Sequence, residues 1–169
     1  MRLTASLSRS PLAFGVALLL LVSLPAWADD LDQRASLQGL PGVTVMVDVL
    51  GPPYGRDALS VPDLQAAVEQ RLRQRGIRVL TEASGLLLLK VTTVGDTGDA
   101  YAVHLALHLL QLVRLDRKLH TPMQFFFSTW DEESLLQVAP TDFPRVVRAT
   151  AMTLVDQFIT AYLEQNPKK

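Results

Sequence analysis

Apolar residues alternate with polar or small ones along residues 101–115, and this pattern predicts the long central strand of an antiparallel sheet. Turn-forming residues bound the segment on both sides. A helix stays open as an alternative, because four polar residues are spaced as on one stripe of a helix: His104, His108, Gln111 and Arg114. The alternation fails at Leu109 and Leu110, so a strand here should bulge or bend at that point, which would reset its faces.

The neighbouring segments also have strand patterns. Residues 42–50 are the clearest case, since valine occupies every second position from Val43 to Val49. The other predicted strands are 77–80, which is short, 86–94, and 123–130, with 135–138 extending the last one after a break at the acidic run 131–133.

Two segments have the 3.6-residue period of amphipathic helices. The first covers about residues 61–75 and follows Ser60, a good N-cap. The second covers about residues 144–165, with Thr141 or Asp142 as its cap. The order strand, helix, short strand, three long strands and helix predicts an α+β fold. We expect a two-layer sandwich in which two helices pack on one face of a mostly antiparallel sheet.

The first 28 residues have the three parts of a secretory signal peptide. Arg2 and Arg9 supply a basic start, residues 11–24 an apolar run, and Ala26 and Ala28 a small-x-small cleavage signal. An uncleaved anchor is the alternative, but the apolar run is short for a membrane span, so we expect no stable span after cleavage. The expected organisation is a signal peptide at 1–28, a flexible leader at 29–41 and a single domain at 42–167.

Composition narrows the compartment and the partners. The chain has 169 residues, a formal net charge of −1 and no cysteine. A near-neutral chain lacks the basic patch that phosphate binding needs, so we expect no nucleic acid partner. A chain without cysteine forms no disulfides, although small secreted domains of eukaryotes usually carry them. Together with the signal peptide, this favours the bacterial periplasm.

The common motifs of catalytic and cofactor sites do not occur in the sequence, which has no Gly-x-Ser-x-Gly elbow and no glycine-rich phosphate loop. His104 and His108 could share a metal ion if their segment were a helix, but on a strand they would lie about 13 Å apart. The carboxylates at 131–133 could serve glycoside hydrolysis, and Ser128 could join a triad. Adjacent carboxylates diverge, however, and nothing in the sequence sets the geometry of a triad. We assign no catalytic, cofactor-binding or metal-binding residue.

One face of the predicted sheet is the surface that the sequence singles out for binding. Two helices cover only one face, so the other must meet solvent, a second subunit or a partner. If Leu105 and Leu107 face the helices, the other face combines small residues, two histidines and aromatic side chains, a mixture typical of interfaces. An ordinary solvated sheet face is the alternative. The predicted interaction residues are Lys90, Thr92, Ala102, His104, Ala106, His108, Gln124, Phe126, Ser128 and Trp130.

Two features resemble known protein families. The order of elements resembles the amino-terminal domain of the TolB family of periplasmic translocation proteins. The segment 154–167, together with residues 129–130 and 76–80, resembles a group of uncharacterised exported bacterial proteins over most of the mature chain. This resemblance implies an exported protein and brings no catalytic residues to carry over.

These observations predict a non-enzymatic module of the bacterial cell envelope that binds an envelope protein or forms homo-oligomers through its open sheet face. Two alternatives stay open. One is a carrier that holds a small apolar ligand between sheet and helices near Phe125 and Phe127. The other is a periplasmic hydrolase.

Overall fold

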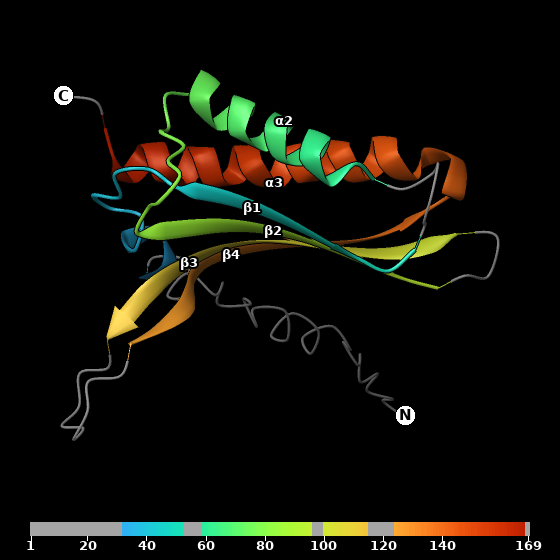
Figure 1. The fold of residues 1–169 in the computed structure, drawn as a ribbon, viewed down its shortest axis with the longest axis horizontal. Coiled ribbons are helices and arrows are strands. Elements are labelled where there is room, and N and C mark those ends of the chain that lie inside the picture. Colours follow the sequence, from blue (N-terminus) through green and yellow to red (C-terminus); the bar gives the residue numbers. More distant parts are fainter. Residues whose placement is uncertain (1–31, 53–58, 96–99, 115–123, 168–169) are drawn as a thin grey trace, which may run out of the picture.

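The computed structural model describes residues 32–52, 59–95, 100–114 and 124–167, which form two layers (Figure 1). One layer is a four-stranded sheet, and the other consists of two helices that lie along the same face of it. The predicted signal peptide, Leu115 and Met123 lie outside the described residues. In chain order the elements are β1 (Thr44–Leu50), α2 (Val61–Gln74), β2 (Gly85–Val94), β3 (Tyr101–Arg114), β4 (Gln124–Val138), the short 3-10 helix η2 (Pro140–Asp142) and α3 (Phe143–Gln165).

The strands lie side by side in the order β1-β2-β3-β4. β1 and β2 are parallel, and α2 connects them, since a parallel pair needs a crossover. β2, β3 and β4 are successive antiparallel neighbours. The predicted α+β fold with a mostly antiparallel sheet is therefore confirmed. β3 is a strand with partners on both sides, so the helical alternative for it is wrong.

Two details of the predicted strands are wrong. Residues 77–80 form no strand, because only Val79 pairs, in an isolated bridge to Val43. Residues 131–133 do not interrupt β4, which runs unbroken from Gln124 to Val138. The side chains of residues 131–133 are half-buried or exposed, so the strand can continue through them without burying a charge.

β3 and β4 change register beside Leu109 and Leu110, where the sequence predicts a bulge. Leu109 is opposite Trp130, whereas Leu110 is opposite Ser128. The extra residue is Thr129 of β4. The predicted position is therefore confirmed, but β3 keeps its alternation and the faces are reset in β4 instead.

The helix boundaries follow the predicted signals closely. The Ser60 side chain caps α2 by accepting a hydrogen bond from the backbone N–H of Asp63. Asp142 occupies the N-cap position of α3, but its carboxylate makes no capping bond and accepts a hydrogen bond from Arg145 at 2.7 Å instead. None of the described helices is long and apolar enough to cross a membrane.

The core fills the space between the sheet and the helices. Leu105, Leu107 and Leu109 of β3 are fully buried in it. The rings of Trp130 and Phe158 meet edge to face, with centroids 5.2 Å apart. Full burial of each large apolar side chain contributes about 1.5–3 kcal/mol to folding. The odd-numbered residues of β3 therefore face the helices, as predicted.

The segment before β1 also belongs to the packed structure. After a helical turn at residues 32–35, Leu37 and Leu40 are buried in the core. Asn166, at the end of α3, binds this segment through two hydrogen bonds of 2.8 Å. Its side chain accepts one from Gly39 N and donates the other to the Leu37 carbonyl. The packed core thus includes part of the segment expected to be a flexible leader.

Candidate interaction surface

The sheet face that α2 and α3 leave uncovered is called the open face here, and no helix of the described residues lies on it (Figure 1). Strand register places alternate side chains of each strand on it. Its members are Thr44, Met46, Asp48 and Leu50 of β1; Leu86, Leu88, Lys90, Thr92 and Val94 of β2; Ala102, His104, Ala106, His108, Leu110, Leu112 and Arg114 of β3; and Gln124, Phe126, Ser128, Asp131, Glu133, Leu135 and Gln137 of β4.

The predicted interaction residues belong to the open face by register, except Trp130. This residue is opposite Leu109, is 3% exposed and packs on Phe158 in the core, so its prediction is wrong. The cause is the extra residue Thr129, which returns the next side chain of β4 to the helix side. The residues that keep their predicted face are Lys90, Thr92, Ala102, His104, Ala106, His108, Gln124, Phe126 and Ser128.

Ala106 lies on the open face by register, yet its side chain is only 1% exposed. It is opposite Lys90 in β2 and Glu133 in β4, and it stands between His104 and His108 along β3. An alanine among four longer side chains forms the floor of the face. A partner would therefore touch these neighbours before it touched Ala106.

The two histidines of β3 have separate partners. His104 Nε2 lies 3.2 Å from Glu133 Oε2 and forms an ion pair when the imidazole is protonated. His108 Nδ1 lies 3.5 Å from Ser128 Oγ, at the outer limit of a hydrogen bond. Four positions of a strand span about 13 Å, so the two imidazoles do not converge on one site.

The side chains around the histidines do not assemble the geometry of a metal or triad site. Within the described ranges, no group of three or more metal-ligating side chains could hold an ion. Ser128 Oγ donates a hydrogen bond to the Trp130 carbonyl at 3.2 Å. A triad also needs a carboxylate bonded to the histidine, and His108 has no such bond among the described residues. These groups are suited to polar contacts with a partner.

Large apolar side chains gather on the open face. Val94 is 64% exposed, Phe126 67% and Leu135 78%. Across the described segments, no exposed large hydrophobic side chain lies on α2 or α3. Single exposed apolar residues are ordinary, but several large ones on the same face are typical of binding surfaces. The exposed apolar residues of this face are Met46, Leu50, Val94, Leu112, Phe126 and Leu135.

The ends of β3 and β4 lead away from the helix layer (Figure 1), and residues 110–114 and 124–128 are called the hairpin end here. Phe125 and Phe127 lie on the helix side by register, but they are 39% and 63% exposed. They are therefore not enclosed between sheet and helices, where a ligand carrier was expected to use them. Phe126 is exposed on the open face, so both faces of the hairpin end are apolar.

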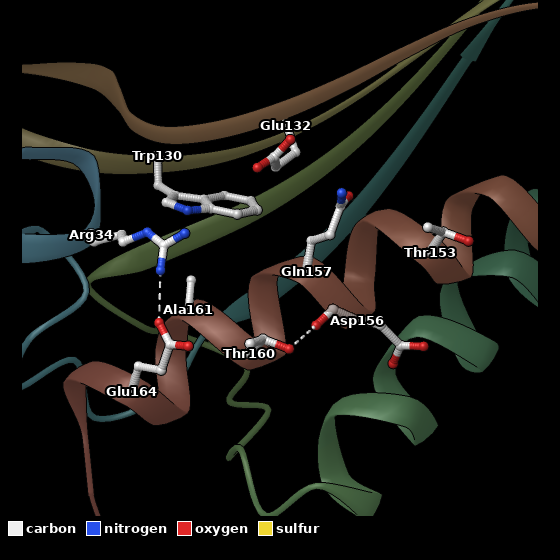
Figure 2. Close-up of a pocket in the computed structure, with 9 residues that line it drawn as sticks. All are labelled: Arg34, Trp130, Glu132, Thr153, Asp156, Gln157, Thr160, Ala161 and Glu164. Carbon is white, nitrogen blue, oxygen red and sulfur yellow. Dashed lines mark hydrogen bonds and ion pairs between the residues drawn. The ribbon is translucent and has the colours of Figure 1, made fainter. Parts of the chain in front are cut away.

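A polar groove of about 390 Å³ lies between β4 and α3 (Figure 2). Arg34 donates a hydrogen bond to the carboxylate of Glu164 at 2.7 Å. Arg71 donates two hydrogen bonds of 2.8 Å to Asp156, and its guanidinium lowers the pKa of that carboxyl. These charged groups already pair with one another, so the groove is better explained as a seam between two layers than as a ligand site. Most of its lining residues lie on α3, and Arg34, Trp130 and Glu132 join them from distant parts of the sequence.

The chain matches no protein-family model, and no curated protein is detectably similar to it in sequence. The fold and its surfaces are therefore the basis for a functional proposal.

Proposed function

We propose that this protein is a non-enzymatic module of the bacterial cell envelope that binds a protein partner through the open face of its sheet. The observation that carries the proposal is the segregation of exposed apolar side chains. They lie on the open face and at the hairpin end, and within the described segments none lies on the helices. Covering such groups is favourable by about 25 cal/mol per Å² of apolar surface, which makes this face the natural contact surface.

Polar groups on the same face would make the contact with a partner specific. Lys90, Asp131 and the exposed pair of His104 with Glu133 lie on the same face as the apolar side chains. Exposed ion pairs add little to the stability of a fold. In an interface they fix register and reject wrong partners, so these groups support specific recognition.

The periplasm is the compartment that we propose. Residues 1–28 have the basic start, apolar run and cleavage signal of an export peptide. The absence of cysteine means that folding in an oxidising compartment needs no disulfide formation.

A crosslinking experiment with surface variants tests the open face. The tagged protein is crosslinked in the bacterial envelope, purified, and its captured partners are identified by mass spectrometry. The double variant Val94→Lys with Leu135→Lys places two charges on the open face. Both positions are well exposed, so each change should cost about 0.5 kcal/mol or less. We expect an envelope protein captured by the wild type to be lost from this variant.

A matched control adds the same charge elsewhere. Ala66→Lys with Ala149→Lys changes two exposed helix positions and should keep the same partner. Binding of that partner, once purified, should be at least about tenfold weaker for the open-face variant alone, a loss of about 1.4 kcal/mol. Equal binding by both folded double variants would reject the open face as the contact surface.

A further inference from the structure

β4 is the edge strand of the sheet, and its outer side is only partly occupied. β3 is its one neighbour among the described strands. Beside the register shift, Gln33 accepts a hydrogen bond from Asp131 N at 3.4 Å, and Ser36 donates one to the Thr129 carbonyl at 3.0 Å. Beyond these contacts, residues 124–128 have no hydrogen-bonding partner on their outer side in the described part of the chain.

This free stretch has the same order of residue classes in both directions. It reads Gln-Phe-Phe-Phe-Ser, without charge and without proline. Register places Gln124, Phe126 and Ser128 on the open face, and Phe125 and Phe127 on the other. A two-fold interface requires a surface that is complementary to itself. A strand edge with this symmetry meets that requirement.

We propose that residues 124–128 pair in the antiparallel direction with the same residues of a second copy of this chain, so that two sheets join edge to edge. With the two-fold axis at Phe126, each Gln124 lies opposite a Ser128 and each Phe125 opposite a Phe127. Paired residues then lie on the same face, so the open faces of both copies form one surface. Main-chain hydrogen bonds supply the attraction, and aromatic cross-strand pairs add to it.

The acidic run that follows the free stretch fixes the direction of pairing. In a parallel arrangement in register, Asp131, Glu132 and Glu133 would each face the same acid of the other copy. In the antiparallel arrangement Asp131 lies five positions from the axis on either side, so the two copies of it are about 33 Å apart. That distance exceeds the Debye length of about 8 Å at physiological salt, so the acidic runs do not oppose association.

Contacts within the chain set one end of the paired stretch. The contacts of Gln33 and Ser36 cover the edge beside the free stretch. Pairing therefore ends at Ser128, and it uses residues 124–128 of both copies. The pairing runs along the strand edge, whereas a partner on the open face contacts side chains that stand out from the sheet. The two proposals can therefore fail separately.

A single introduced thiol tests the position of the two-fold axis, because the chain has no cysteine. Directly opposite residues have Cβ atoms about 4.5–5.5 Å apart. Mild oxidation of the mature Phe126→Cys protein should therefore give a disulfide-linked dimer. Leu135→Cys is the control, since Leu135 is exposed on the same strand and face. Its two thiols would lie about 60 Å apart, so this variant should stay unlinked.

Sedimentation of the mature protein tests the pairing without a thiol. The wild type should show a concentration-dependent dimer. The double variant Phe125→Lys with Phe127→Lys puts lysine opposite lysine at two places and should weaken the dimer on the order of 100-fold. Both side chains are exposed, so the variant should fold. Leu135→Lys should dimerise as the wild type does, even if it loses a partner bound on the open face.

Several outcomes would overturn the pairing. A wild type that sediments as a monomer at the highest soluble concentration would do so. Equal crosslinking of Leu135→Cys and Phe126→Cys would place the contact elsewhere. A monomeric wild type that captures a different protein through Phe125 and Phe127 would mean that the edge serves another partner.

Discussion

Replacing Thr93 by valine should make the protein more stable. Thr93 lies in β2 on the helix side of the sheet, opposite Val103, and is 4% exposed. Its hydroxyl is buried without a hydrogen-bond partner in the described part of the structure. A buried hydroxyl in this state costs about 1–3 kcal/mol. Valine has nearly the same shape, and it replaces the hydroxyl by a methyl group whose burial is favourable by about 0.8 kcal/mol.

We expect the free energy of unfolding to rise by about 1–2 kcal/mol, since relief of the unpaired hydroxyl is the main gain. With a urea dependence of about 2 kcal/mol per molar, the middle of the usual range, the midpoint should move up by roughly 0.5–1 M. Trp130 supplies the signal. The chain has two tryptophans, and in a protein made from Asp29 onward, without Trp27, the remaining one is Trp130, which is buried in the core. Its fluorescence therefore reports on the packing between the layers.

The neighbouring residue gives a matched control. Thr92→Val makes the same change in the same strand, but Thr92 lies on the open face and is half-buried. Its effect should stay within about 0.5 kcal/mol. If Thr93→Val unfolded at the same urea concentration as the wild type or a lower one, the unpaired hydroxyl would not be a cost to this fold, and the reasoning would be refuted.

Two further predictions concern the backbone and pH. Gly51→Ala should lower the free energy of unfolding by about 2 kcal/mol or more. Gly51 has a φ of +91°, and a Cβ there would overlap the Thr93 carbonyl oxygen. Gly95→Ala, with a φ of +99° but no described atom within 4 Å of the added Cβ, should lower the free energy of unfolding by about 1 kcal/mol, and thermal unfolding compares the two variants. Asp156→Asn should remove a contribution below about 1 kcal/mol, because Arg71 lowers the folded-state pKa of a carboxyl that is 40% exposed. A carboxyl whose pKa is lower in the folded state stabilises the fold at pH values above its unfolded-state pKa of about 3.9. This contribution is lost as the pH falls through the folded-state pKa. The difference in urea midpoint between wild type and Asp156→Asn should therefore be larger at pH 7 than at pH 3, and an equal difference would count against the ion pair.

The sheet could be predicted from the sequence because side-chain period and burial agree along its strands. In β1, Val45 and Val47 are buried and Met46 between them is exposed. In β3 the odd-numbered leucines fill the core. The predicted strand at residues 77–80 is wrong, because this short apolar run forms a single bridge and not a ladder of paired residues.

The face on which Trp130 lies could not be predicted, because no sequence pattern in β4 indicates the register shift. Residues 125–127 are all phenylalanine, so the strand shows no alternation from which to count. The sequence predicts the bulge from Leu109 and Leu110 in β3. That break has a different cause: Leu109 faces the core and Leu110 faces the open side of an unbroken strand. The position was right, but the extra residue belongs to the partner strand.

The exposure of the hairpin end follows from the lengths of the elements. α3 has 23 residues and spans about 35 Å, whereas β3 has 14 residues and spans about 46 Å. A helix layer of that length cannot cover the whole strand, so one end must extend beyond it. An apolar pattern shows which side chains avoid water, but it does not show what covers them. Burial in the described core does not explain the apolar character of residues 125–127, whereas the edge-to-edge pairing proposed above would remove these side chains from water.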